Sequence, residues 1–273
     1  MIDPNKRRKI IVVHGVQVGD NDDLHQDEAV KKLFENRRGN FSVDADVDLY
    51  KYEDLNNEVL DPLQKLVSYI ITNPIGDKLA QAAMDLVGDV VISLSKNKTS
   101  EKIRQGLEDK IMGYYNNGHA VYVVAHSLGT VYSFDVINRL MQRDELFDAD
   151  NILTWPVLSW LTMGSPLGLG MFKATGRKEL TDLGDGENLF RWRNYFDRND
   201  PVVSGNIFGA DTDITQVAEE YYKDNDEQGW DMDDYAVNTG KQHMLAHVAY
   251  WEVPIVGEGI VDMVNEILLG ESE

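Results

Sequence analysis

One serine in this sequence has the surroundings that nucleophilic catalysis requires. Ser127 lies in Ala-His-Ser-Leu-Gly, residues 125–129, directly behind an apolar stretch and ahead of a helical pattern. A tight turn from a strand into a helix exposes the serine oxygen and directs backbone N–H groups towards a developing oxyanion. The crowded turn needs small neighbours, and Ala125, where glycine is usual, is the least bulky substitute. The pattern predicts a nucleophile; the alternative is that Ser127 only caps a helix.

The stretches around Ser127 alternate between expected strands and expected helices. Residues 10–13 form a short apolar run rich in β-branched residues, as buried parallel strands do, and residues 120–125 form another. Further strands are expected at residues 41–52, 153–163 and 190–196, and helices at residues 22–38, 99–116, 131–141 and 255–269. This rhythm predicts an α/β fold with a mostly parallel central sheet flanked by helices, in a single domain over residues 1–273.

Residues 55–98 interrupt the alternation. Two apolar-rich segments in this region, residues 60–71 and 75–94, are separated by Asn73 and Pro74. They predict an inserted helical segment. This segment could form a cap over the site or a wall along an acyl chain, and the alternative is ordinary core packing.

The composition limits the partners that we expect. There are 47 acidic against 26 basic residues, a formal net charge of −21, so long-range repulsion opposes binding to nucleic acid and to anionic membranes. No run approaches the roughly 18 apolar residues of a membrane span, and the N-terminal stretch lacks the pattern of a signal peptide. We therefore expect a cytoplasmic protein that binds no nucleic acid and does not insert stably into membranes. The composition indicates no particular protein partner.

Metal and cofactor chemistry have little support in the sequence. There is no cysteine, which excludes disulfides, thiolate catalysis and cysteine zinc sites. Residues 224–229 begin like a calcium loop, but the twelfth position holds Tyr235 where the motif requires Glu. Residues 43–48 alternate Asp with apolar residues, which is typical of an edge strand with one face in water. We expect no metal and no cofactor.

Five motifs along the chain occur in the order found in a known superfamily. They are Val-His-Gly-Val at residues 13–16, Ala-His-Ser-Leu-Gly at 125–129, Met-Gly-Ser-Pro-Leu-Gly at 163–168, Asp-Pro-Val-Val at 200–203 and Ala-His-Val-Ala-Tyr-Trp at 246–251. In these motifs the chain resembles the lipase and esterase branch of the α/β-hydrolase superfamily, particularly its intracellular acyl-ester hydrolases. The resemblance runs over nearly the whole chain and implies the α/β-hydrolase fold.

The resemblance also implies a catalytic triad. The superfamily order of serine, acid and histidine restricts the base to His243 or His247. The family position favours His247, in an expected loop before the terminal helix. The acid is expected in the turn that leads into Asp-Pro-Val, which implies Asp200 with Asp197 as the alternative, although either aspartate could simply cap that turn. The expected triad is therefore Ser127, Asp200 and His247.

Several loop residues are implied as walls of the same site. The resemblance places the oxyanion donors on the backbone N–H groups of Val16 and Leu128. The other loop residues expected at the site are His14, Gly15, His126, Gly129, Ser165 and Pro166. We expect His14 to be a turn histidine without a catalytic function, and Ser165 to be non-catalytic. Gly15 permits a close backbone approach in either case.

Together these expectations describe a serine hydrolase that cleaves a carboxylic ester of a small molecule or lipid through an acyl-enzyme intermediate. The same machinery could act on a thioester, an amide or a phospholipid acyl chain, because the sequence does not define the leaving group. A non-catalytic, hydrolase-like binding protein is the alternative from another class. It is favoured if the three side chains do not meet within hydrogen-bond distance.

Overall fold

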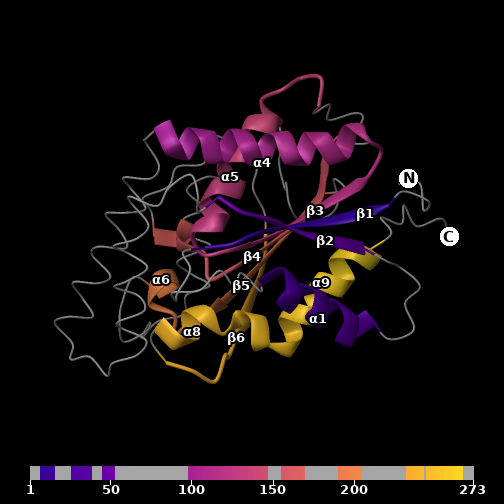
Figure 1. Cartoon of the computed structure of the whole chain (residues 1–273). Coiled ribbons are helices and arrows are strands. Elements are labelled where there is room, and N and C mark those ends of the chain that lie inside the picture. The colour runs from indigo at the N-terminus through magenta and orange to yellow at the C-terminus, as the bar shows by residue number, and fades with distance from the viewer. Residues whose placement is uncertain are drawn as a thin grey trace.

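In the computed structural model, six parallel strands form one sheet (Figure 1). The structure describes residues 7–15, 26–38, 45–52, 98–146, 155–169, 190–204, 232–242 and 244–266. The strands are β1 (Arg8–Val13), β2 (Ala45–Tyr50), β3 (Ala120–His126), β4 (Val157–Met163), β5 (Arg191–Asp197) and β6 (Asp233–Val237). Their order across the sheet is β2-β1-β3-β4-β5-β6, and every neighbouring pair is parallel. The fold is therefore α/β with a parallel sheet.

Helices cover both faces of this sheet. On one face lie α4 (Lys98–Asn116) and α5 (Leu128–Met141), and on the other α1 (Gln26–Arg38) and α9 (Pro254–Asn265) lie side by side (Figure 1). Successive strand side chains point to opposite faces, so Ile11 packs into the core under α4 and α5 while Ile10 packs into the core under α9. Two covered faces explain why residues 10–13 of β1 are apolar at every position.

The carboxyl ends of the strands gather at one edge of the sheet, because all strands run in the same direction. The short elements near this edge are η3 (Pro166–Leu169), α6 (Pro201–Ser204), α8 (Met244–Val248) and η5 (Tyr250–Glu252). The chain passes from β1 to β2 on one side and later to β3 on the other, so the strand order switches direction between β1 and β3. Ligand sites of open α/β sheets lie at such a switch point.

The expected elements agree with the structure at their centres and differ at their ends. Helix α5 begins at Leu128, three residues before the expected start at residue 131. Helix α9 ends at Asn265, so the helix expected over residues 255–269 wrongly included Glu266. Strand β6 was not expected, because its half-exposed sequence Asp-Asp-Tyr-Ala-Val carries no apolar run. Residues 53–97, which contain nearly all of the expected insertion, lie outside the described residues, and the cap stays a prediction.

Strand β2 lies at the edge of the sheet, as the Asp alternation predicted for the described part of residues 43–48. Its carboxylates form ion pairs: Asp46 with Lys9 at 2.8 Å and Asp48 with Lys110 at 2.5 Å. Within the described ranges, no group of three or more His, Asp or Glu side chains could hold a metal ion. Residues 224–229 lie outside those ranges.

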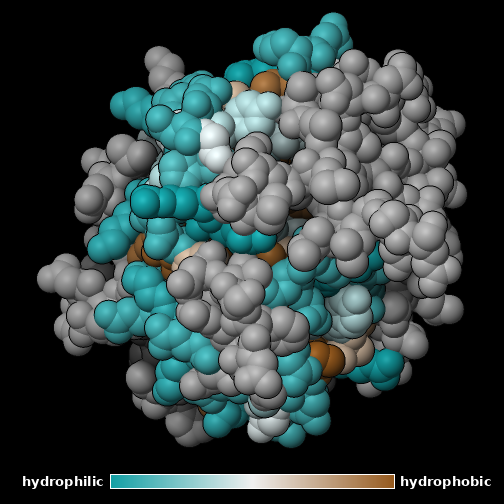
Figure 2. All heavy atoms as spheres, turned by 90° about the vertical axis from the view of Figure 1, so that its right-hand side faces the viewer, coloured by the Kyte–Doolittle hydropathy of each residue, from teal (hydrophilic) through white to brown (hydrophobic). Residues whose placement is uncertain are grey.

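The face of the molecule shown in Figure 2 is largely polar where the structure describes it. Figure 2 views the right-hand side of Figure 1, and most described residues visible there are hydrophilic, with only small, separate hydrophobic areas. None of the described helices is long and apolar enough to cross a membrane.

Candidate active site

Ser127 occupies a sharp turn between β3 and α5. Its backbone has φ 54° and ψ −128°, and it is the one non-glycine residue with positive φ in the described part of the chain. Such a conformation costs on the order of 1–3 kcal/mol and persists where the surroundings hold it. Here the Ser127 N–H donates to the Met163 carbonyl at 3.1 Å, and the Ser127 carbonyl accepts from Thr130 N–H at 2.9 Å. The Ser127 side chain makes no helix-capping hydrogen bond.

Glycines allow the loop after β1 to approach this turn closely. A Cβ on Gly15 would lie 2.4 Å from the Ser127 Cβ, and a Cβ on Gly129 would lie 2.3 Å from the Val13 carbonyl oxygen. Real Cβ atoms do not come so near, so any side chain at either position would displace the turn. Ala125, completely buried in β3, is the largest residue among the small neighbours of Ser127 in this packing.

The structure brings Ser127, His247 and Asp200 together in one line of hydrogen bonds. His247 Nδ1 lies 2.8 Å from Asp200 Oδ2, and His247 Nε2 lies 2.8 Å from Ser127 Oγ. A carboxylate only accepts, so Nδ1–H donates to Asp200 and leaves Nε2 as the acceptor for the Ser127 hydroxyl. Asp200 is fully buried, and Ser127 keeps 7% of its surface exposed. The line therefore runs from a fully buried carboxylate to a serine that keeps a small part of its surface exposed.

Asp200, and not Asp197, is the aspartate that contacts His247. The other Asp200 oxygen, Oδ1, accepts from Val202 N–H at 2.9 Å, so Asp200 also caps the turn into α6. Asp197 Oδ2 accepts from the N–H and the hydroxyl of Thr239 at 2.8 and 2.7 Å. The prediction that His247 lies in a loop was wrong, because His247 lies in the short helix α8. His243 lies outside the described residues.

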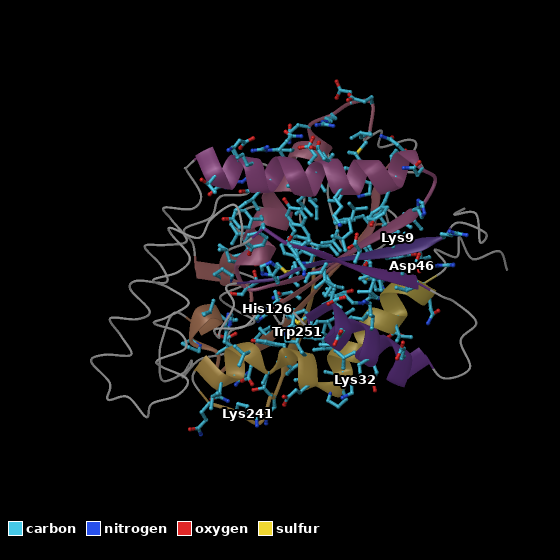
Figure 3. All side chains as sticks on the ribbon, viewed as in Figure 1. Lys9, Lys32, Asp46, His126, Lys241 and Trp251 are labelled. Carbon is cyan, nitrogen blue, oxygen red and sulfur yellow. The ribbon has the colours of Figure 1, made fainter. Side chains whose placement is uncertain are left out.

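His126, the last residue of β3, contacts the backbone and the ring of His247. Its Nε2–H donates to the His247 carbonyl at 2.7 Å, and the two rings lie 4.8 Å apart. Trp251 packs edge-on against His126 at 5.5 Å, and Figure 3 shows these two side chains together, away from Lys9 and Asp46. Burial, and after it the charge of His247, lowers the pKa of His126 from 6.5 to about 3. His126 is therefore a neutral hydrogen-bond donor near pH 7.

The loop after β4 forms another wall of the site. Gly164 has φ +56°, and a Cβ there would lie 3.1 Å from both Asp200 Oδ2 and His247 Nδ1. Ser165, also buried, has its hydroxyl 2.9 Å from the Thr130 hydroxyl, and Pro166 opens η3. The absence of a side chain at Gly164 thus lets the chain after β4 pack closely against Asp200 and His247. The Ser165 hydroxyl connects this loop to α5 through Thr130.

His14 is packed as part of the loop after β1. Its Nδ1–H donates to the Gly15 carbonyl at 2.6 Å, and its ring stacks on Tyr52 at 4.3 Å. The Tyr52 hydroxyl donates to the His14 carbonyl at 2.7 Å, which joins the end of β2 to this loop.

Of the two expected oxyanion donors, Val16 lies outside the described residues. Leu128 is the first residue of α5, so its N–H has no carbonyl partner within the helix.

Sequence reasoning assigned no role to Tyr250, although it lies inside a quoted motif. Tyr250 is fully buried, and its hydroxyl donates to Asp200 Oδ2 at 2.8 Å. Its position three residues after His247 was the available signal, since residues three apart lie on one side of a helical turn.

No protein-family model matches this chain, and no curated protein matches it in sequence.

Proposed function

We propose that this chain is a serine hydrolase of the α/β-hydrolase fold that cleaves carboxylic esters through an acyl-enzyme intermediate. The observation that carries the proposal is the line of two 2.8 Å hydrogen bonds from Ser127 through His247 to Asp200. A serine that only caps a helix would direct its hydroxyl to a backbone N–H of the first turn. The Ser127 hydroxyl makes no such bond and contacts the imidazole instead.

In the first half of the reaction, Ser127 Oγ attacks the ester carbonyl carbon while His247 Nε2 takes the hydroxyl proton. Asp200 stabilises the imidazolium that forms and keeps Nδ1 protonated. The carbonyl oxygen becomes an oxyanion beside the turn, where the Leu128 N–H is available as a donor. When the tetrahedral intermediate collapses, the bond from carbon to the alkoxide oxygen breaks and His247 returns its proton to the departing alcohol.

In the second half, water replaces the alcohol. His247 Nε2 takes a proton from water as the water oxygen attacks the acyl carbon, and the proton then passes to Ser127 Oγ as the carboxylic acid leaves. The convergence of the three side chains argues against a purely binding protein, because a buried carboxylate, an imidazole and a serine hydroxyl have no need to line up for binding alone.

The test is the hydrolysis of p-nitrophenyl butyrate, together with labelling by a fluorophosphonate. Ser127→Ala should lower kcat/KM by at least about 10⁴-fold and abolish labelling, because it removes the oxygen on which the proposed acyl-enzyme forms. Ser133→Ala is the matched control, since the Ser133 hydroxyl donates to the Gly129 carbonyl within α5 at 2.8 Å. Labelling mapped to Ser127 supports the proposal. Hydrolysis that survives in Ser127→Ala refutes it.

A further inference from the structure

Tyr250 and His247 bind the same carboxylate oxygen. The Tyr250 hydroxyl donates to Asp200 Oδ2 at 2.8 Å, and His247 Nδ1–H donates to that atom at 2.8 Å as well. Both residues come from one short stretch, His247 in α8 and Tyr250 at the start of η5. The stretch that carries the candidate base is therefore attached to the candidate acid at two points.

The Tyr250 hydroxyl has a fixed direction. The backbone N–H of Asp197 donates to its oxygen at 2.9 Å. A phenol carries one proton, so with this donor on its oxygen it directs that proton to Asp200. Burial and the adjacent Asp200 charge raise the pKa of Tyr250 well above 10.0. The Tyr250 hydroxyl therefore keeps its proton near neutral pH and donates it to the carboxylate.

We propose that Tyr250 is a positioning residue of this site, whose hydroxyl fixes the Asp200 carboxylate against His247 and takes up part of its negative charge. The role rests on the proposed function. Three donors then define the plane of the carboxylate: Val202 N–H on Oδ1, and Tyr250 and His247 on Oδ2. With part of its charge directed to Tyr250, Asp200 attracts a proton on His247 less strongly than a carboxylate bound by His247 alone would.

Other titratable groups surround this arrangement on the described elements. From β3, His126 lies 4.8 Å from the His247 ring and 6.0 Å from the Tyr250 ring, and its pKa of about 3 keeps it neutral. His14, from the loop after β1, acts electrostatically on His126. At the end of β5, the Asp197 carboxylate accepts hydrogen bonds from Thr239. All of these groups remain when only the Tyr250 oxygen is removed.

Tyr250→Phe is the test, because it deletes one oxygen and keeps the ring. The matched control is Tyr50→Phe. Tyr50 is also a buried tyrosine, and its hydroxyl donates to the Ile103 carbonyl at 2.6 Å, between β2 and α4. Tyr250→Phe removes the hydrogen bond to Asp200 and the one from the Asp197 N–H, and Tyr50→Phe removes the one to the Ile103 carbonyl, so both variants are expected to lose stability. A loss confined to stability would make Tyr250 no different from Tyr50.

The distinguishing readout is the ¹⁵N NMR titration of the histidine rings, with the His247 signal assigned by its disappearance in His247→Gln. In Tyr250→Phe the midpoint of the His247 titration should move up by about half a pH unit or more, because Asp200 turns more of its charge to His247. In Tyr50→Phe it should not move. In Tyr250→Phe, the acid limb of the profile of kcat/KM against pH should move to higher pH together with the His247 midpoint.

Two results would overturn the role: an unmoved midpoint in Tyr250→Phe, or an equal shift in Tyr50→Phe. If Tyr250→Phe does not fold, 4-aminophenylalanine at position 250 supplies a weaker donor on the same ring. A raised midpoint in that variant supports the role, and a midpoint equal to that of the unchanged protein refutes it. If the unchanged protein cleaves no ester, the proposed function fails while the titration still decides how Tyr250 acts on His247.

Discussion

Replacing Asp200 with Asn keeps the size of the side chain and tests how the carboxylate is used. Both Asp200 oxygens accept hydrogen bonds: Oδ1 from Val202 N–H, and Oδ2 from His247 and Tyr250. An asparagine has one acceptor oxygen, so its NH₂ group must face at least one of these donors. If NH₂ faces His247, the imidazole must accept through Nδ1, and Nε2 then carries the proton and cannot receive the one on Ser127.

The size of the effect follows from the contact. An aspartate and an imidazolium whose charge centres lie about 4 Å apart attract by about 4 kcal/mol at an effective dielectric of 20, or roughly 10³ in rate. Loss of the correct tautomer raises the expected fall in kcat/KM towards about 10⁴-fold. The lost charged hydrogen bond should also lower the free energy of unfolding by about 1.5–3 kcal/mol.

The assay is kcat/KM for p-nitrophenyl butyrate, with urea unfolding measured on the same samples. Asp197→Asn is the comparison, because it removes a carboxylate that contacts Thr239 instead of His247, and its kcat/KM should fall far less. An Asp200→Asn variant that keeps kcat/KM within about tenfold of the unchanged protein would show that Asp200 does not act as the acid of a triad.

Two further substitutions test the surroundings of the site. Gly164→Ala should lower kcat/KM by about tenfold or more, since its Cβ would lie 3.1 Å from Asp200 Oδ2 and His247 Nδ1. Gly118→Ala, with a similar φ of +78° but nothing near its Cβ, should lose only stability, and equal activity losses would contradict this reasoning. Because the pKa of His126 falls from 6.5 to about 3 on folding, the unfolded chain binds the extra proton. The stability contributed by a neutral His126 is therefore present above pH 6.5 and lost below it, by about 1.4 kcal/mol between pH 8 and pH 5.5. His126→Gln keeps a donor without this titration, and urea unfolding at both pH values should show a correspondingly flatter dependence; identical slopes would exclude the effect.

Much of the fold could be read from local sequence. The β-branched run at residues 10–13 and the run at 120–125 lie in the interior strands β1 and β3, because a strand buried on both faces must be apolar at successive positions. Strand β6 could not be predicted in this way, because it is only partly buried and needs no apolar run. It is held at the edge by pairing with β5, and its half-exposed side chains leave no periodic signal.

Part of the candidate site could be predicted from the sequence. Ser127 could be singled out, since the crowding of its turn requires small residues that are adjacent in the sequence. The preference for Asp200 over Asp197 came from resemblance alone. Asp197 ends β5 and Asp200 follows it by three residues, and only the path of the chain back to His247 brings one of them to 2.8 Å from the ring.

By itself, the sequence determined the small residues around Ser127 and the strand and helix on either side, because these depend on side-chain volume and periodicity over a few neighbouring positions. Only the tertiary structure decided that the Ser127 hydroxyl turns to His247, that His126 holds the His247 carbonyl, and that Tyr250 shares Asp200 with His247. These contacts join residues up to 121 positions apart. Their geometry is set by the packing of parallel strands whose carboxyl ends meet at one edge, and such packing leaves no local pattern in the chain.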